Sequence, residues 1–225
     1  LRPAERVLEA GCGGGALLPA YAAAVGPSGR VVGVDISPDQ IAAAREACAG
    51  NAFVEATIAD INALPCATGS FDALVAIQVI EYLADPLPAL SELRRVSAAG
   101  ARLVIVATIS DTMFWNTAAP DLTTRILAAW RTHAPHQNLP AELRPLLEGA
   151  GFRLVRQAPV SIVNSAYHED AFAYWLARLM VAYVTTSRLV DAEDAARWLQ
   201  ALEEAHAGSR FFFSSTPVLS LAIAA

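Results

Sequence analysis

The 225-residue sequence contains no lysine, and its formal net charge at neutral pH is −6. Arginines at positions 94, 95 and 102 are too few and too scattered to form a basic stripe. Nucleic-acid binding needs such a stripe, because contacts to phosphates supply most of the affinity. We therefore expect a small-molecule partner and no nucleic-acid partner.

Cysteine and long apolar runs are also scarce. The three cysteines, Cys12, Cys48 and Cys66, show neither disulfide nor CxxC spacing, so reduced thiols in the cytoplasm are the simplest interpretation. No run reaches about 18 apolar residues and no secretory signal is found, which predicts that no segment spans a membrane. HxxxH and carboxylate pairs at ligand spacing are missing as well, so no metal site is predicted. We expect a cytoplasmic monomer or homodimer.

Hydrophobic residues make up 55% of the chain, which is enough for a large core. The first 110 residues alternate between apolar, β-branched stretches and helical stretches that stop near glycine. Strands are expected at residues 7–10, 30–35, 53–58, 71–77 and 101–108, and helices at residues 16–24, 38–48 and 87–96. This alternation predicts a parallel sheet with right-handed crossovers and helices on both faces.

The second half is less regular, and helical patterns dominate it. We expect helices at residues 112–130, 139–149, 168–186 and 191–207, and a sixth strand at residues 152–160. Residues 210–224 are too many for a single interior strand, so a bend near Pro217 is expected.

The stretch Val7-Leu8-Glu9-Ala10-Gly11-Cys12-Gly13-Gly14-Gly15 joins the first expected strand to the first helix. Its alternate glycines, Gly11, Gly13 and Gly15, can adopt positive φ and have no Cβ to keep a ligand from the backbone. Glu9 needs donors nearby, because an uncompensated carboxylate is costly in apolar surroundings. The loop therefore suits a nucleotide, although an ordinary tight turn has the same composition.

Acidic residues follow three of the expected strands: Glu9, Asp35 and Asp60. Ligands of open α/β sheets bind at the carboxyl ends of the strands, and Asp35 lies 20 residues after Gly15, a distance typical of a ribose-binding carboxylate. A nucleoside-like ligand accounts for all three acids together. Taken singly, Asp35 could instead cap the next helix, and Asp60 could close a turn.

The glycine stretch resembles motif I of class I S-adenosylmethionine-dependent methyltransferases, an acid followed by G-x-G-x-G. Further stretches resemble later motifs of the same family in the same order: Val31–Ser37 (VVGVDIS), Ala59-Asp60-Ile61 with Leu64-Pro65, Ser70-Phe71-Asp72 through Ile80-Glu81-Tyr82-Leu83-Ala84-Asp85-Pro86, Leu93–Val96 and Ala99–Val104. The resemblance is close over residues 5–108. Residues 139–152 and 211–222 are more loosely similar to the ubiquinone/menaquinone methyltransferases.

Two features depart from the family pattern. Tyr82 stands where many relatives have histidine, although it retains an aromatic hydrogen-bonding group. The sequence also starts at Leu1, immediately before the first expected strand, so we expect that an N-terminal segment able to cover the active site is missing.

The resemblance implies a Rossmann-like, doubly wound, mostly parallel seven-stranded sheet with inserted and C-terminal cap helices. It implies one methyltransferase domain, residues 1–225, with a cofactor-binding half at residues 1–110 and substrate-cap helices at residues 111–150 and 161–209. The residues implied to bind S-adenosylmethionine are Glu9, Gly11, Cys12, Gly13, Gly15, Asp35, Ile36, Asp60, Ile61 and Gln78. Asp35 would bind the ribose hydroxyls, Ile36 would pack on the adenine, and Asp60 would accept from its amine. Gln78 would face the methionine part.

The implied activity is methyl transfer to oxygen, nitrogen or carbon of a small, fairly apolar metabolite. A general base is needed only where the acceptor must lose a proton, and histidine is suited to that task near neutral pH. His133 and His136 lie where relatives build the acceptor pocket and are the candidates, although solvated loop histidines are common. The isolated cysteines do not indicate arsenic methylation.

Two other functions were weighed against this one. A nicotinamide-dependent oxidoreductase would have different glycine spacing and a set such as Tyr-x-x-x-Lys, which a chain without lysine cannot supply. A non-catalytic module that binds S-adenosylmethionine stays open, because methyl transfer requires few catalytic side chains.

Overall fold

The computed structural model describes all residues from Leu1 to Ala225 and divides into two compact units. The sheet unit comprises Leu1–Ala107, Leu139–Ala158 and Val218–Ala225, and the second unit comprises Thr108–Asn138 and Pro159–Pro217. Residues 139–150, which we expected among the cap helices, therefore belong to the sheet unit. They form a helix there because their apolar side chains complete the core of the sheet.

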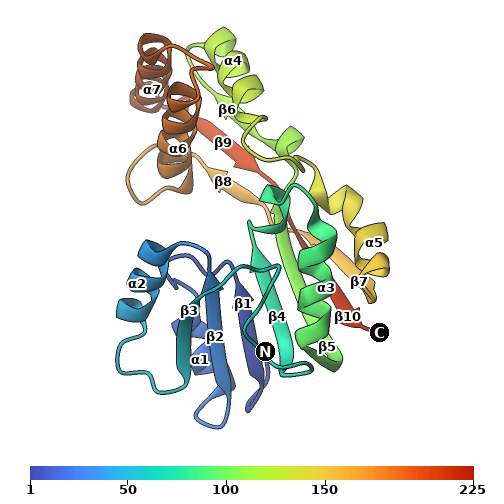
Figure 1. Cartoon of the computed structure of the whole chain (residues 1–225). Coiled ribbons are helices and arrows are strands. Elements are labelled where there is room, and N and C mark those ends of the chain that lie inside the picture. Colours follow the sequence, from blue (N-terminus) through green and yellow to red (C-terminus); the bar gives the residue numbers. More distant parts are fainter. The chain divides into compact units, whose positions relative to one another are not determined.

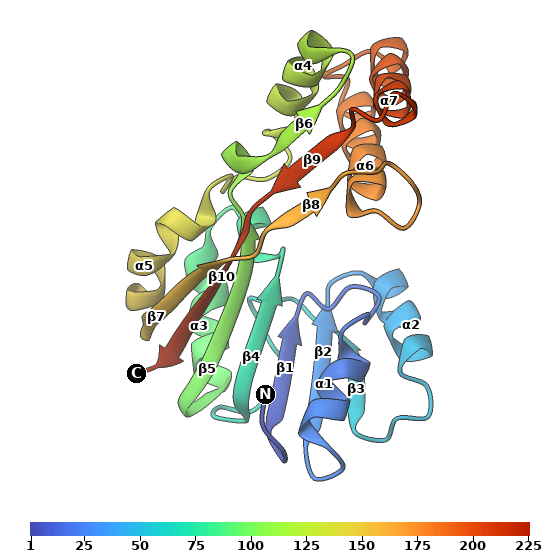
Figure 2. The same cartoon turned by 180° about the vertical axis from the view of Figure 1, so that it is seen from behind.

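The sheet unit contains the seven-stranded sheet (Figure 1). Its strands are β1 (Arg6–Ala10), β2 (Arg30–Asp35), β3 (Val54–Ile58), β4 (Phe71–Ile77), β5 (Ser97–Thr108), β7 (Phe152–Pro159) and β10 (Pro217–Ala224), in the order β3-β2-β1-β4-β5-β10-β7. The pairs β1–β2, β1–β4, β2–β3 and β4–β5 are parallel. The arrow of β10 points opposite to those of β1 and β4 in Figure 2. The predicted mostly parallel sheet is confirmed.

Helices cover both faces of this sheet. Helices α1 (Leu18–Val25) and α2 (Pro38–Ala47) pack on one face, and α3 (Pro86–Val96) and α5 (Leu139–Gly149) pack on the other. Successive strand residues point to opposite faces, so Val7 joins the core under α1 and α2 while Leu8 joins the core under α3 and α5. The apolar run of β4 is explained by burial on both faces.

Local signals set the starts of two helices. Ser37 is the N-cap of α2, where its hydroxyl accepts from the Gln40 backbone N–H at 3.4 Å, and Pro38 occupies the first turn. Asp85 caps α3 in the same way by accepting from the Leu87 N–H at 3.0 Å. These caps place both helices directly after loops at the carboxyl ends of strands.

The second unit combines a small antiparallel sheet with three helices. Its strands are β6 (Phe114–Asn116), β8 (Ile162–Asn164) and β9 (Phe212–Ser215), in the order β6-β9-β8, and its helices are α4 (Pro120–Trp130), α6 (Phe172–Thr186) and α7 (Ala192–Ala207). Its core is aromatic: Trp198 is fully buried, and its ring lies 5.3 Å from that of Trp115. The Trp198 indole N–H donates to the Thr123 hydroxyl at 3.0 Å.

Three expectations for this half need correction or refinement. The helix expected at residues 112–130 is wrong before Pro120, because Phe114–Asn116 pairs with β9 and proline starts the helix. The helix expected from residue 168 starts only at Phe172, and the strand β8 was missed. The expectation that residues 210–224 are not one interior strand is confirmed, since β9 ends at Ser215, β10 starts at Pro217 and the two belong to different sheets.

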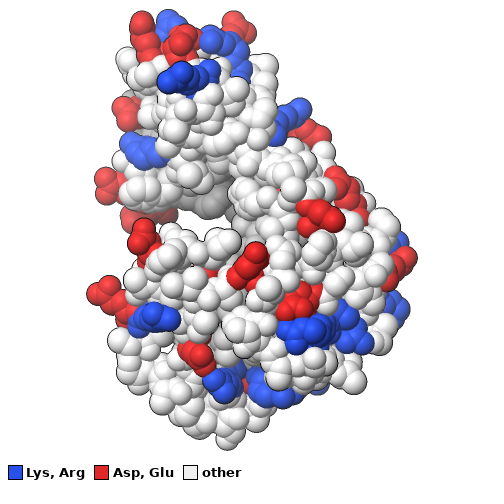
Figure 3. Space-filling model, in the orientation of Figure 1, with Lys and Arg blue, Asp and Glu red and all other residues white.

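Short 3₁₀ turns at Ile80–Tyr82 and Ser110–Thr112 complete the secondary structure. None of the helices has both the length and the apolar character needed to cross a membrane. On the face drawn in Figure 3, acidic and basic side chains are interspersed rather than separated by sign.

Candidate cofactor site

The glycine loop between β1 and α1 contains two glycines that the protein's own packing requires. A Cβ on Gly11 would lie 2.3 Å from the Val79 Cγ2 atom, and one on Gly15 would lie 2.9 Å from the Ala44 Cα atom. Both have positive φ, 74° and 77° respectively. These two residues thus fix the close approach of the loop to neighbouring segments, and they would do so without any ligand.

Gly13 is different, because nothing in the protein closely approaches the place of its missing side chain. Its φ is 51°, but the nearest atom to an added Cβ would be the Gln40 Oε1 at 3.6 Å. Its N–H donates to the Asp35 Oδ2 at 2.9 Å. The Gly13 backbone is therefore held toward the end of β2 and remains open to a ligand.

Asp35 links the end of β2 to this loop. Its Oδ1 accepts from the Ser37 N–H at 2.9 Å while its Oδ2 accepts from Gly13. A carboxylate offers about four acceptor positions, so two remain for a ligand such as a ribose diol. Ile36, directly after it, exposes 71% of its surface, so it offers an apolar side chain that the face of an aromatic base can cover.

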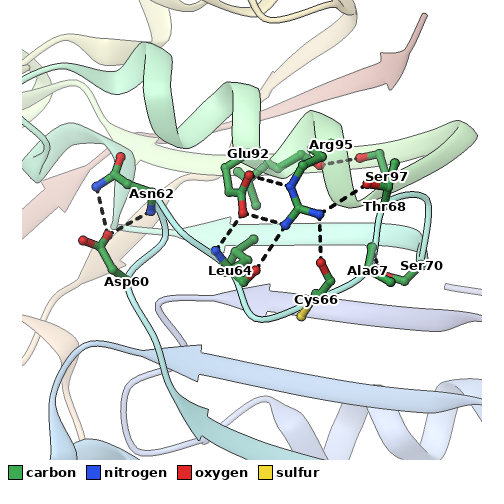
Figure 4. Close-up of polar contacts among 11 residues, drawn as sticks. Asp60, Asn62, Leu64, Cys66, Ala67, Thr68, Ser70, Glu92, Arg95 and Ser97 are labelled. Atoms are coloured by element: carbon green, nitrogen blue, oxygen red, sulfur yellow. Dashed lines mark hydrogen bonds and ion pairs between the residues drawn. The ribbon is translucent and has the colours of Figure 1, made fainter.

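Asp60 follows β3, the neighbour of β2. Its Oδ1 accepts from the backbone N–H and the side-chain amide of Asn62, at 2.8 and 2.9 Å (Figure 4). Asp60 therefore closes a turn through its Oδ1, as the alternative interpretation predicted. Its Oδ2 makes no such contact and could still accept from a ligand. Ile61 is buried in the core under α3, so only its backbone could meet a ligand.

The segment after Asp60 is fastened by two residues of α3, as Figure 4 shows. Glu92 Oε1 accepts from the Leu64 N–H at 2.8 Å. The Arg95 guanidinium pairs with Glu92 at 2.7 Å and donates to the carbonyl oxygens of Leu64 and Cys66. This ion pair lowers the pKa of Glu92 and keeps it charged. From the sequence alone, Glu92 and Arg95 have no predicted role in the site. Two arginines at the end of a helix do not by themselves indicate that one of them contacts a distant loop.

Two carboxylates are buried at the carboxyl ends of adjacent strands. Glu9 of β1 is 4% exposed, its Oε2 has no hydrogen-bond partner, and burial raises its pKa to about 7. Glu81, in the turn after β4, is 5% exposed with neither oxygen in a well-formed hydrogen bond. Burial raises the pKa of Glu81 to about 7 as well, and the Val79 and Glu81 backbone N–H groups offset only part of this rise. Sequence reasoning quoted Glu81 in a motif but assigned it no role.

Gln78 stands at the end of β4 with a φ of 53°, a left-handed conformation that is rare for a residue with a side chain. Its N–H donates to the Val106 carbonyl at 2.8 Å, so pairing with β5 holds the conformation. Strained backbone of this kind is concentrated at functional sites. The feature is consistent with the position at which we predicted contact with the ligand.

Comparison with known proteins agrees with this geometry. A family model described as "Methyltransferase domain" matches residues 8–105, the stretch that contains the glycine loop, Asp35, Asp60 and Glu81. This stretch therefore resembles a methyltransferase domain. The seven-stranded sheet and the position of the glycine loop after its first strand are those expected from the resemblance described above.

Several relatives to which the chain is similar are named as methyltransferases. The chain is 31% identical to an arsenite methyltransferase of Halobacterium salinarum over 163 residues, which are 71% of this chain and 40% of the relative. It is 28% identical to an aklanonic acid methyltransferase of a Streptomyces species over 170 residues, 68% of this chain and 77% of the relative. The chain spans less than half the length of several curated relatives that it matches.

A solved structure of a candidate methyltransferase from Bacillus halodurans has a similar fold. It superimposes with a TM-score of 0.67 at 20% identity and covers 99% of this chain and 94% of that one. This likeness extends the shared fold beyond residues 8–105 to nearly the whole chain.

The candidate base residues lie outside the seven-stranded sheet, in the second unit. The His133 ring stacks on Trp130 with centroids 3.7 Å apart, and its Nδ1 lies 2.6 Å from the Trp130 carbonyl oxygen. Burial lowers the pKa of His133, which favours the neutral imidazole. His136 is half-buried in the same loop. Their role as a base stays a prediction.

Cys12 belongs to the glycine loop, but its side chain does not face outward. It is buried against Gly33, where an added Cβ would lie 2.9 Å from the Cys12 sulfur. Burial, together with the Glu9 and Asp35 charges, raises the pKa of the thiol to about 12. Cys12 can therefore offer a ligand only its backbone.

A groove of about 760 Å³ lies at the other side of the sheet unit, between the end of α1 and the turn before β3. Its lining residues are Pro19, Ala22, Ala23, Gly26, Pro27, Ala49, Gly50, Asn51, Ala52 and Phe53. None of them carries a titratable side chain, so the groove offers no group for acid–base chemistry or for pairing with a cation.

Proposed function

We propose that the protein binds S-adenosylmethionine at the glycine loop and transfers its methyl group to a small, fairly apolar organic acceptor. The observation that carries the proposal is the contact of Asp35 with Gly13. It joins a carboxylate that has acceptor positions to spare with a loop whose backbone is open. A sugar diol bound by Asp35 would then lie beside that backbone.

The residues at this edge fit the parts of the cofactor by their chemistry. Asp35 would accept from the ribose hydroxyls, and the exposed Ile36 side chain would be covered by the adenine. The buried and incompletely paired Glu9 would balance a positive charge, which the amino-acid end of the cofactor carries. Gly13 and Gln78 would border that end.

The bound cofactor supplies an activated methyl group, so the protein's own task is to align the acceptor with that methyl group and to exclude water. The closely packed glycines Gly11 and Gly15 and the left-handed backbone at Gln78 are suited to holding one geometry. No proton transfer is needed for acceptors that attack without losing a proton. For other acceptors we propose His133 or His136 as the base, with the neutral state of His133 as support.

An organic acceptor is favoured over arsenite, although one relative is named for arsenite. The three cysteines are far apart in sequence, and burial raises the pKa of each thiol. Thiols with raised pKa values are poor thiolate ligands at neutral pH. The name of the other relative, an aklanonic acid methyltransferase, is consistent with an organic acceptor.

The second unit is our proposed source of acceptor selectivity. Its sheet exposes apolar side chains, with Phe114 at 54%, Val163 at 55% and Phe212 at 39%. An apolar acceptor would gain affinity by covering such side chains. Phe212→Ser should then raise the KM for the acceptor while the dissociation constant for the cofactor stays unchanged.

Calorimetric titration tests the central claim. We expect micromolar binding of S-adenosylmethionine and S-adenosylhomocysteine, no binding of NADH, and at least a hundredfold loss of affinity in Asp35→Ala. Asp39→Asn, an exposed change on α2, is the matched control and should bind like the wild type. If neither sulfur nucleoside binds, the proposal is wrong; if both bind but no acceptor in a broad panel is methylated, a binding module is the better description.

A further inference from the structure

Glu9 is enclosed by groups that do not neutralise it. Its strand, β1, lies between β2 and β4, and the side chain is 4% exposed. The titratable groups that interact with it are Tyr21 on α1, Cys12 in the loop and Cys48 after α2. None of these is a cation. An ionised Glu9 is therefore stabilised by donors or by an arriving positive charge.

Tyr21 is the donor that reaches this carboxylate. Its hydroxyl donates to the Glu9 Oε1 at 3.4 Å, while the Glu9 Oε2 has no partner. Helix α1 turns Leu18, Ala22 and Val25 into the core, and Tyr21 lies on the same side because positions three and four apart share a helix face. The ring itself packs against that core.

We propose that Tyr21 is a positioning residue of the cofactor site: its hydroxyl holds Glu9 ionised, so that the carboxylate balances the cationic amino-acid end of the methyl donor. This inference rests on the proposed function. Tyr21 touches neither cofactor nor acceptor in this account and acts through Glu9 alone. Nothing in the glycine motif requires a hydroxyl at this position of the helix.

The sign of the expected pH dependence follows from the burial of Glu9. Burial raises the pKa of the carboxyl to about 7, and the Tyr21 hydroxyl opposes part of that rise. Below this pH the site has lost its negative charge, so affinity for a cationic ligand falls as the pH falls. Removing the hydroxyl raises the pKa further, and the loss of affinity then begins at higher pH.

The test compares wild type, Tyr21→Phe, Glu9→Gln and the double variant by calorimetry with S-adenosylhomocysteine and S-adenosylmethionine from pH 5.5 to 8.5. Tyr21→Phe keeps the ring that packs in the core. We expect it to weaken binding about fivefold at pH 7. The ratio to wild type should approach one at pH 8.5, because Glu9 is ionised there in both proteins.

Glu9→Gln should remove the pH dependence, and adding Tyr21→Phe to it should change nothing further. A Tyr21→Phe loss that is equal at every pH, or that persists in the Glu9→Gln background, overturns the inference while wild-type binding still supports the proposed function. Proton release gives a second measurement should a variant not fold. Wild type at pH 6.5, titrated in buffers of different ionisation enthalpy, should release protons on binding; no proton release would also overturn the inference.

Discussion

The two units bury different kinds of side chain. The sheet unit holds both buried carboxylates of the protein, Glu9 and Glu81, at the ends of neighbouring strands. The second unit buries no acid, and its core is made of aromatic residues: Trp115, Trp130, Tyr167, Trp198, Phe211 and Phe213. Buried acids without partners lower stability, whereas close-packed rings raise it.

We interpret the buried carboxylates of the sheet unit as features of a ligand site, and the aromatic core of the second unit as packing that stabilises the fold. The loop glycine, the two carboxylates and the exposed Ile36 are all explained better by something that binds than by packing. In the second unit the buried polar groups are neutral: the Trp198 N–H donates to the Thr123 hydroxyl, whereas the Trp115 Nε1 has no partner. Variants whose effects on cofactor affinity and on the free energy of unfolding differ can therefore test this comparison of the two units.

The largest expected effect is that of Gly15→Ala. The added Cβ would lie 2.8 Å from the Ala44 Cβ and 2.9 Å from its Cα, and φ is 77°. Left-handed strain and overpacking together should lower the free energy of unfolding by about 3 kcal/mol or more. Urea denaturation followed by circular dichroism measures this.

Gly26→Ala and Gly13→Ala are the controls for that variant. Gly26 has a φ of 70° and no atom within 4 Å of an added Cβ, so it should lose only about 1–2 kcal/mol. Gly13→Ala should lower the free energy of unfolding by about as much as Gly26→Ala does. Only Gly13→Ala should also lower the affinity for the cofactor. Equal affinities in these two variants would show that the open space at Gly13 is not a binding feature.

Glu81 gives a prediction about stability and pH. Its pKa is raised from 4.5 to about 7, so the folded protein binds this proton more tightly than the unfolded chain does. Its contribution is complete below the unfolded pKa and is lost as the pH rises to about 7 and beyond, in total roughly 3 kcal/mol. Glu81→Gln should therefore unfold with a smaller difference between pH 5 and pH 8 than wild type.

The pH comparison needs a control on the surface. Glu46→Gln changes an exposed carboxyl on α2 and should leave the pH dependence of the free energy of unfolding as it is. Denaturant titrations at the two pH values measure both variants. An unchanged pH dependence in Glu81→Gln would mean that Glu81 is solvated or paired.

Thr123→Val probes the second unit. The Trp198 N–H would lose its partner inside the core, where an unpaired donor costs about 1–3 kcal/mol. Thr124→Val is the matched control, since the Thr124 hydroxyl is exposed and bonds only to the Pro120 carbonyl. Stability should fall in the first variant alone, and neither should change cofactor affinity. A loss of affinity in Thr123→Val would contradict the separation of the two cores.

Much of the sheet unit could be predicted because its signals are local. Strands β2 and β4 occur at the expected residues, since runs such as Arg30–Asp35 are bounded by turns and buried on both faces. The Ser37 cap needs only its neighbours. The positions of Asp35 and Asp60 after successive strands follow from the same alternation. The sequence therefore predicted that both acids lie at the carboxyl-end edge of the sheet.

What could not be predicted depends on distant partners. Phe114–Asn116 is a strand only because Phe212–Ser215, almost a hundred residues later, pairs with it, and sequence alone favoured a helix there. The contact of Tyr21 with Glu9 needs the rotation of α1 over β1. The orphaned oxygens of Glu81 follow from burial by the whole core rather than from any pattern around residue 81.

The smallest effect on stability is expected for Ile36→Ala. Ile36 is 71% exposed, so the free energy of unfolding should change by less than about 0.5 kcal/mol. Cofactor affinity should fall about tenfold, because the adenine would lose apolar surface to cover. Leu189→Ala, an exposed apolar residue of the second unit, should alter neither property. Unchanged affinity in Ile36→Ala would place the adenine elsewhere. Ile36 would then be an ordinary exposed residue of the surface, as we expect Leu189 to be.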